Sequence, residues 1–348
     1  AKQQTAGPLQ LPLNDVAVMA LDYHGKEGIA TSIGHAPVAS LIDEVAGSRN
    51  AIAESLTNLV WAPLEDDLKS VSLSANWMWP CKNEGEDARL YKAVEAVSNF
   101  AIELGINIPT GKDSLSMKQK YSDKEVIAPG TVIISAAGHC NDISKVVEPV
   151  FQKNAENKIY HIDFSNDAFK LGGSSFAQAI AGIGNESPTI QSSEKFKTAF
   201  NTVQQLIKEG RILAGHDISA GGMITTLLEM CFSQNNLGAN LDISALGEKD
   251  NIKALFAENS GVIIQSADAD IERILTEQGV TFTHLGNAVR SNEIQITNHG
   301  ETETFNIPYL RDVWFGTSYL LDDKQTANGL ATARFNNYTN YLYIIKPI

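Results

Sequence analysis

The sequence predicts a protein of mixed α/β class with two domains. Its 348 residues exceed one ordinary domain, for which about 100–200 residues is usual. Segments with the spacing of amphipathic helices and segments that alternate like strands occur in both halves of the chain, which argues against the all-α and all-β classes. Hydrophobic residues make up 43% of the chain and charged residues 20%, so neither a disordered protein nor a coiled coil is expected.

The first domain is expected at residues 1–148. It starts with the strands VAVMALDY and GIATSIGH, which the turn-like HGKEG joins. Apolar residues at helical spacing then predict a helix from Asp43 to Val60, and Ser70–Trp79 alternates like a strand. A second helix is predicted by the apolar stripe Leu90, Val94, Val97, Ala101 and Leu104. The buried-looking strand TVIISAAG completes the domain.

The second domain is expected at residues 149–322, after the polar, unpatterned linker EPVFQKNAENK. Its expected elements are, in order, a strand at KIYHIDF, a helix after Leu171–Ser175, a long helix containing Phe196 and Leu206, a helix containing Met223 and Cys231, a helix at Ile252–Glu258, a strand at GVIIQS, a helix at Asp270–Gln278, and a hairpin of EIQIT with ETFNI. The tail at residues 323–348 lacks a clear period and ends in the apolar YLYIIKPI. We expect it to lead into a domain that this chain lacks.

The charge balance limits the partners. Lys and Arg number 27 against 41 Asp and Glu, a net charge of −14. Such a surface repels phosphate backbones and anionic bilayers, so neither nucleic acid nor a membrane is an expected partner. No apolar run reaches the roughly 18 residues of a membrane span, and the three cysteines form no zinc or disulfide pattern. We therefore expect a cytoplasmic protein.

Two oxygen donors share one face of the first predicted helix. Glu54 and Asn58 are four residues apart, away from the apolar stripe. A carboxylate and an amide oxygen suit Mg²⁺, which prefers oxygen ligands and often bridges phosphates. Taken alone, such a pair is more often a solvated helix face.

The segment Ala214–Gly222 combines a strand, a glycine-rich turn and a helix start. Free N–H groups there would attract phosphate oxygens, and Asp217 could hold a bridging metal. The alternative is that Asp217 or Ser219 simply caps the helix. His216 is either a general acid/base or, more often for a lone histidine, a structural group.

Two further turns carry weaker signals. The segment Thr110–Met117 lacks the spacing of a P-loop, so Lys112 either neutralises a phosphate or belongs to a polar turn. Leu171–Ser175 is either an anion-binding turn or a helix N-cap, the latter being the commoner case. No order of Ser, His and Asp and no cysteine setting points to a nucleophile, so no catalytic residue is assigned.

Several of these motifs together resemble a known family. The runs AESLTNLVWAPL, SLSANWMWPCKNEGEDARLYKAVEAV, IPTGKDSLSM and GHDISAGG occur in this order within roughly Leu11–Trp314 and are similar to the later half of the large-type phosphoribosylformylglycinamidine synthase. That family uses ATP and glutamine to convert formylglycinamide ribonucleotide to the amidine in purine biosynthesis. The resemblance implies an aminoimidazole ribonucleotide synthetase-like architecture, with an N-terminal α/β domain followed by a C-terminal α+β domain.

The resemblance also implies a role for this chain. It is similar to the second of two tandem copies, so the first copy and a glutaminase domain would be its partners in an ATP-dependent carbon–nitrogen ligase, and the isolated chain would be inactive. The second copy would hold an auxiliary site for Mg²⁺ and ATP or ADP. The implied metal ligands are Asp15, Glu54, Asn58 and Asp217, and the implied nucleotide contacts are Asn14 and Ser219. Ala220 departs from the family, which often has Asp there.

Two alternatives stay open. One is a stand-alone nucleotide-binding module; the other is a different ATP-dependent enzyme of the same superfamily, such as thiamine-phosphate kinase, selenophosphate synthetase or a hydrogenase-maturation protein. The absence of a cysteine near the start of the sequence disfavours selenophosphate synthetase. Because first domains pair in this architecture, the resemblance also implies a homodimer of the separated copy through residues 10–145.

Overall fold

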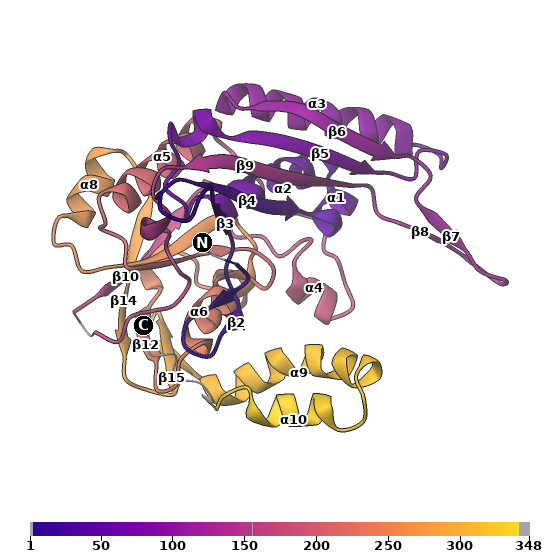
Figure 1. Ribbon diagram of the computed structural model, residues 1–348. Coiled ribbons are helices and arrows are strands. Elements are labelled where there is room, and N and C mark those ends of the chain that lie inside the picture. The colour runs from indigo at the N-terminus through magenta and orange to yellow at the C-terminus, as the bar shows by residue number, and fades with distance from the viewer. Residues whose placement is uncertain (1–2, 155, 341–348) are drawn as a thin grey trace.

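The computed structural model describes residues 3–154 and 156–340 and contains two large sheets with helices packed on them (Figure 1). The first sheet has five strands in the order β3-β4-β9-β5-β6. Only β5 and β6 pair in parallel. The strand bounds are Ala17–Ala20 (β3), Gly28–His35 (β4), Thr131–Cys140 (β9), Ser72–Met78 (β5) and Asn107–Ser114 (β6). Two short strands, β1 (Thr5–Ala6) and β2 (Leu11–Pro12), precede them.

Helices cover one face of the five-stranded sheet. They are α1 (Pro37–Ile42), α2 (Glu44–Leu59) and α3 (Glu86–Leu104). Asp43 caps α2 by accepting from the backbone N–H groups of residues 45 and 46. At Gly34 of β4, an added Cβ would lie 2.3 Å from the carbonyl oxygen of Ala51. The missing side chain therefore lets α2 pack directly against β4.

The other face of this sheet is not covered by any element that the structure describes. Residues of β4 alternate between buried and exposed along the whole strand, and Ile29 and Ile33 are 41% and 57% exposed. A hairpin of β7 (Lys118–Lys120) and β8 (Glu125–Ile127) extends from the same domain (Figure 1). The first domain thus presents to solvent a sheet face on which Ile29 and Ile33 alternate with Thr31 and His35.

The second sheet has seven strands in the order β11-β13-β10-β14-β12-β15-β16, and only β12 and β15 pair in parallel. Its strands are Ala214–Ile218 (β11), Gly261–Ser266 (β13), Lys158–Asp163 (β10), Phe282–Val289 (β14), Gly238–Asp242 (β12), Glu293–Asn298 (β15) and Glu301–Asn306 (β16). Its helices are Ser175–Ala179 (α4), Ser193–Lys208 (α5), Gly222–Phe232 (α6), Asn251–Phe256 (α7) and Ile271–Glu277 (α8).

In the seven-stranded sheet, β11, β13 and most of β10 are buried on both faces, whereas β12 and β16 also carry exposed residues. One face packs with α5 and α8 into a core that also includes the first domain, and the other packs against α6 and α7. The side chain of Gln204 on α5 donates to the carbonyls of Val60 and Ala62 and accepts from the N–H of Leu64. The two domains therefore share one core across a hydrogen-bonded junction.

Two helices follow β16 within residues 307–337, and the sequence did not predict them. Helix α9 (Ile307–Gln325) runs through the expected boundary at residues 322 and 323, and α10 (Leu330–Asn337) returns along it. Stacked rings of Phe315 and Tyr338, 4.2 Å apart, join the two helices. The expectation of an unpatterned tail is thus wrong as far as residue 340, and residues 341–348 lie outside the described part.

Most predicted elements are present, and several elements were not predicted. The segment around Lys112, for which a phosphate contact and a polar turn were both left open, lies in β6 rather than in a turn, and Lys112 Nζ donates to Ser114 Oγ at 2.7 Å. Strands β12 and β14 were not predicted, and both lie inside the seven-stranded sheet. Among the described residues, no helix is long and apolar enough to cross a bilayer.

Candidate metal centre

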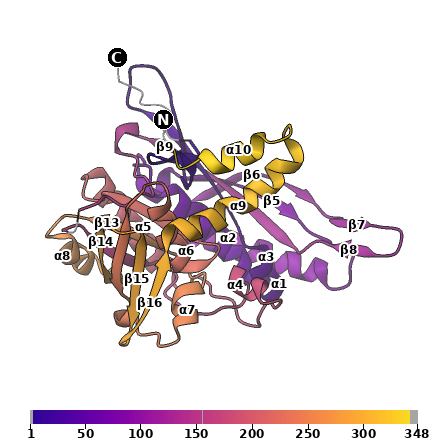
Figure 2. The ribbon, with the colours of Figure 1, turned by 90° about the horizontal axis from the view of Figure 1, so that it is seen from below.

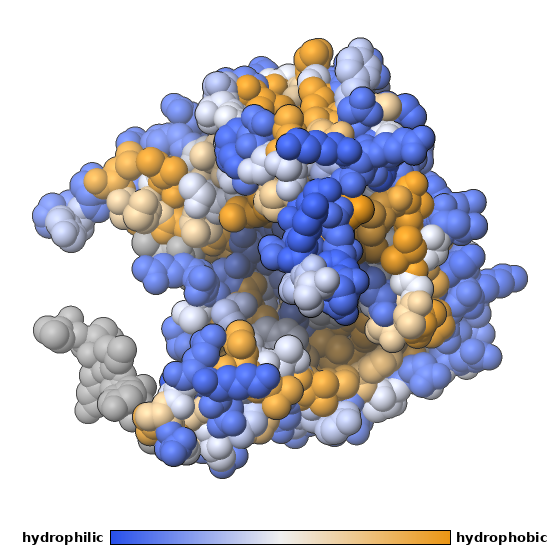
Figure 3. Space-filling view, turned by 90° about the vertical axis from the view of Figure 1, so that its right-hand side faces the viewer, coloured by the Kyte–Doolittle hydropathy of each residue, from blue (hydrophilic) through white to orange (hydrophobic). Residues whose placement is uncertain are grey.

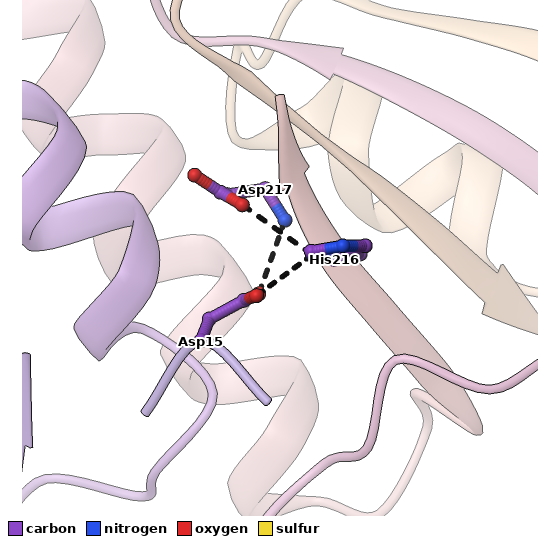
Figure 4. A group of neighbouring side chains, drawn as sticks. All are labelled: Asp15, His216 and Asp217. Atoms are coloured by element: carbon purple, nitrogen blue, oxygen red, sulfur yellow. Dashed lines mark hydrogen bonds and ion pairs between the residues drawn. The ribbon is translucent and has the colours of Figure 1, made fainter. Parts of the chain in front are cut away.

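Three buried side chains from distant parts of the chain meet between the domains. Asp15 lies in the loop before β3, and His216 and Asp217 lie on β11; Figure 4 shows them pointing toward one another. One ligand-type atom from each lies within 4.8 Å of the others. Their side chains are almost inaccessible to solvent, at 4%, 8% and 2% exposure respectively. Domain docking therefore creates the group.

His216 bridges the two aspartates. Its Nδ1 lies 2.8 Å from Asp15 Oδ1 and 3.3 Å from Asp217 Oδ1. The second oxygen of Asp15, Oδ2, accepts from the backbone N–H of Asp217 at 3.2 Å. Asp217 Oδ2 is buried and has no hydrogen-bond partner among the described residues. An unpartnered buried carboxylate oxygen is costly unless a further group contacts it.

The other side of the imidazole also faces a carboxylate. His216 Nε2 lies 3.0 Å from Glu229 Oε2 on α6, and Glu229 Oε1 accepts from Trp314 Nε1 on α9 at 2.9 Å. Burial alone would lower the pKa of His216, but the charge of Asp15 and the hydrogen bonds to its three carboxylate neighbours raise that pKa well above its ordinary value. Its contacts with three carboxylates favour the structural over the acid/base interpretation of His216.

Two carboxyl groups of this region, those of Asp15 and Glu54, have raised pKa values. Burial raises the pKa of Asp15 to about 6, with His216 lowering it and the charge of Asp217 raising it further. Burial also raises the pKa of Glu54 to about 8, although the N–H of His35 lowers it, and the charges of Asp217 and Glu258 add to the rise. A divalent cation would stabilise the ionised form of these carboxyl groups and reduce the repulsion among their charges. The residues present fit Mg²⁺, because they are oxygen donors and one buried oxygen is free.

The side chains of Glu54 and Asn58 form hydrogen bonds with the backbone of β4. Glu54 Oε2 accepts from the N–H of His35 at 2.7 Å, and Asn58 Nδ2 donates to the carbonyl of Ile33 at 3.0 Å. The amide oxygen of Asn58 is left as the acceptor atom of that side chain. Of the three predicted carboxylate ligands, the structure places Asp15 and Asp217 together and leaves Glu54 outside that group.

The helix-capping alternative for the glycine-rich segment is wrong. Helix α6 begins at Gly222, its N-cap residue Gly221 has a positive φ of 92°, and no side chain in the described residues caps it. Asp217 instead points toward Asp15 and His216 (Figure 4). The interpretation of Leu171–Ser175 as an N-cap is confirmed, because Ser174 Oγ accepts from the N–H of Ala177 at 3.1 Å.

The two predicted nucleotide contacts border different cavities. Asn14 lines one of about 640 Å³ beside the open sheet face, and its Nδ2 donates to the carbonyls of Gln3 and Thr5 at 2.7 Å. Ser219 lines a second cavity of about 250 Å³ between the domains, together with Glu54. Figure 3 shows the molecule deeply hollowed on the side that bears α1, α4 and the β7–β8 hairpin.

The carboxylate of Glu258 lies beside this cavity, where both glycine-rich turns would otherwise offer their N–H groups to an anion. Glu258 Oε1 accepts from the N–H of Ser175 and from the N–H of Gly221, each at 2.7 Å. Sequence reasoning missed Glu258, since nothing in its neighbourhood signals that contact. It also missed Glu229, for which a signal existed: Glu229 is the one charged residue of the otherwise apolar and neutral helix α6.

Two family models match the chain. Residues 1–139 match the FGAR-AT PurM_N-like domain, and residues 157–298 match the C-terminal domain of AIR synthase related proteins. The predicted two-domain, synthetase-like fold class is therefore confirmed. Helices α9 and α10 lie beyond the second match.

Curated relatives match nearly the whole chain. It is 40% identical, over 93% of its length, to a probable phosphoribosylformylglycinamidine synthase of Arabidopsis thaliana named as chloroplastic/mitochondrial, and covers 23% of that protein. It is 37% identical, over 93% of its length, to the phosphoribosylformylglycinamidine synthase of Homo sapiens, and covers 25% of it. The chain thus spans about a quarter of the length of these relatives.

Solved structures share the fold at low identity. PurLQS from Thermotoga maritima aligns with a TM-score of 0.65 and 14% identity, covering 85% of this chain and 46% of that one. PurL from T. maritima complexed with ATP aligns with a TM-score of 0.63 and 13% identity, covering 88% and 47%. The hydrogenase maturation protein HypE in complex with ATP aligns with a TM-score of 0.56 and 14% identity, covering 82% and 86%.

Proposed function

Because the chain corresponds to a region of phosphoribosylformylglycinamidine synthase, with a PurM-like N-terminal domain and an AIR-synthase-related C-terminal domain, we propose that it works as one part of that enzyme. The whole enzyme would convert formylglycinamide ribonucleotide to the amidine with ATP and glutamine in purine biosynthesis. The similarity to synthases over 93% of the chain supports this role. Since the chain spans only about a quarter of those proteins, the activity belongs to the complete enzyme.

Within that enzyme we assign this region an auxiliary site for Mg²⁺ with ADP or ATP. The observation that carries the proposal is the buried pair Asp15 and Asp217, with Asp217 Oδ2 left free. Asp15 and Asp217 would hold the cation first, and Glu54 and the amide oxygen of Asn58 would complete the ligands. Asn14 and Ser219 would contact the nucleotide. The bound cation would supply the positive charge that lets a polyphosphate approach these carboxylates.

The partners follow from the same assignment. The open face of the five-stranded sheet, with Ile29 and Ile33 exposed on β4, would pack against the preceding synthetase-like half of the enzyme. A glutaminase domain would be a further partner. No residue of this chain is assigned to catalysis, so we expect neither glutamine nor ammonia to support amidine formation by the isolated chain.

Calorimetry tests the site directly. ADP should bind the chain in the presence of Mg²⁺ and should bind far more weakly in excess chelator, because the carboxylates of Asp15 and Asp217, with Glu54 beyond them, repel the phosphates. At a hundredfold excess over Kd, binding should stabilise the fold by roughly 2.7 kcal/mol. Asp217→Asn keeps the shape but removes one charge and one strong ligand, so it should weaken Mg²⁺-dependent binding more than it lowers stability.

A matched control is Asp242→Asn. Asp242 lies at the end of β12 and accepts from the N–H and hydroxyl of Ser244, at 2.9 Å and 2.5 Å. It should change ADP affinity little. Equal ADP binding with and without Mg²⁺, or an Asp217→Asn variant that binds like wild type, would refute the proposed site.

A further inference from the structure

We infer that Glu229 and Trp314 are positioning residues of the metal site: they hold His216, and through it Asp15, in the orientation that Mg²⁺ requires. This inference rests on the Mg²⁺ site proposed above. It adds two residues that lie outside the predicted ligand set, and it brings helix α9 into the function of the site.

A continuous series of polar contacts links α9 to the metal group. Trp314 Nε1 donates to Glu229 Oε1 at 2.9 Å, and Glu229 Oε2 lies 3.0 Å from His216 Nε2. His216 Nδ1 then lies 2.8 Å from Asp15 Oδ1. Four elements that are separate in the sequence, namely α9, α6, β11 and the loop before β3, each contribute one member of the series.

Glu229 fixes the direction of the imidazole ring. The ring is rigid, so a contact that holds Nε2 also sets where Nδ1 points. Both oxygens of Glu229 are engaged, one by His216 and one by Trp314, so the carboxylate has little freedom to turn. Partners of this outer kind orient the groups around a metal, and their loss commonly weakens metal affinity by about 10- to 100-fold.

Contacts between α9 and α6 hold Trp314 in place. Arg311 is 5% exposed, and its Nη1 donates to the carbonyl of Phe232 at the end of α6 at 3.1 Å. The rings of Phe232 and Trp314 pack 5.7 Å apart. Figure 2 shows α9 passing beside α6. Because α9 lies beyond the matched C-terminal domain, the metal site depends on a segment outside that domain.

The test compares Trp314→Phe and Glu229→Gln with Trp79→Phe in the full chain. Trp79 is fully buried in the first domain, and its Nε1 has no hydrogen-bond partner among the described residues. Trp79→Phe therefore makes the same chemical change without touching the series. Mg²⁺-dependent ADP affinity is measured by calorimetry, thermal unfolding is measured for each variant, and the His216 ring nitrogens are followed by ¹⁵N NMR in metal-free protein.

We expect Trp314→Phe and Glu229→Gln to weaken Mg²⁺-dependent ADP binding by roughly tenfold or more, with the larger loss for Glu229→Gln. Both should also shift the His216 Nε2 resonance before any metal is added. Trp79→Phe should change neither quantity, even where it lowers the unfolding temperature by as much. A purely structural role would move the unfolding temperature without moving Kd or the resonance.

Two outcomes overturn the inference in distinguishable ways. If wild type binds Mg²⁺-ADP and both variants bind it with the affinity of Trp79→Phe, the positioning role is wrong and the proposed site stands. If wild type shows no Mg²⁺-dependent binding at all, the proposed site fails, and the inference that rests on it fails as well.

Discussion

The two sheets of this chain differ in how far helices cover their faces. In the seven-stranded sheet, every residue of β13 is buried, because helices pack on both faces. In the five-stranded sheet, β4 alternates strictly between buried and exposed residues, because helices cover one face only. A strand buried on both faces reads as a continuous apolar run, whereas alternation marks a face left to solvent or to a partner. Strand β13 therefore leaves no face for a further layer, whereas the outer face of β4 is open to one.

The largest expected effect comes from replacing one isoleucine of each sheet by alanine. Ile264 on β13 is fully buried in the joint core, and Ile33 on β4 is 57% exposed. Ile264→Ala should lower the free energy of unfolding by about 2–5 kcal/mol, because it leaves a cavity. Ile33→Ala should change it by less than about 0.5 kcal/mol in the monomer. Urea unfolding at low protein concentration measures both, and similar losses for the two variants would show that the open face is packed.

A second, intermediate effect should appear where the two domains meet. Glu54 has a folded-state pKa of about 8 against an ordinary 4.5, chiefly through burial. The folded protein thus keeps a proton that the unfolded chain loses. Stability from this group is full below pH 4.5 and is lost as the pH rises toward 8, with a slope of at most about 1.4 kcal/mol per pH unit.

Glu54→Gln isolates this contribution. Unfolding free energies are measured for wild type and variant between pH 5 and 8.5 in metal-free buffer. The variant should lose less stability than wild type as the pH rises, and Mg²⁺ with ADP should reduce the difference by stabilising the ionised carboxylate. Parallel pH curves for the two proteins would mean that Glu54 ionises normally.

The smallest expected effect on stability comes from a substitution on the open face of the five-stranded sheet. We expect the separated chain to pair through this face, since that would cover apolar residues such as Ile33. Ile33→Lys should yield a monomer at high micromolar concentration while changing monomer stability little. Ile102→Lys on α3, at a site 75% exposed, is the matched control and should stay dimeric. Light scattering distinguishes them, and a monomeric wild type would contradict the expectation.

The same contrast explains which elements the sequence could predict. Strand β13 and helix α5 carry strong apolar patterns, so both were predicted from local sequence. Strand β14 carries Thr283, His284 and Asn287 with Gly286 at its centre, and its partner β12 begins with glycine. Such residues are usual in turns. These strands form because flanking strands of the sheet supply their hydrogen bonds, a tertiary effect that no local window contains.

The candidate site also contains a part that the sequence predicted and a part that depends on the fold. Spacing alone singled out Glu54, Asn58 and Asp217, and the resemblance added Asp15. Sequence alone could not decide whether Asp217 caps a helix, because the answer depends on Gly221 adopting a positive φ and preceding α6 without a side-chain cap. The contacts of His216 with Glu229 and Asp15 depend on the packing of three elements, and that packing follows from the whole fold.

The separation of the two aspartates in the chain has a consequence for biosynthesis. Asp15 and Asp217 touch across 202 positions of sequence. During translation, Asp15 leaves the ribosome long before β11 exists, so a nascent first domain lacks the second half of the metal group. Closing so long a loop is slow, and it requires that both domains have already folded and docked. Metal binding at the proposed site would therefore come late, after both domains have folded and docked. A chain that ends before β11 would lack Asp217 and could not bind the ion there.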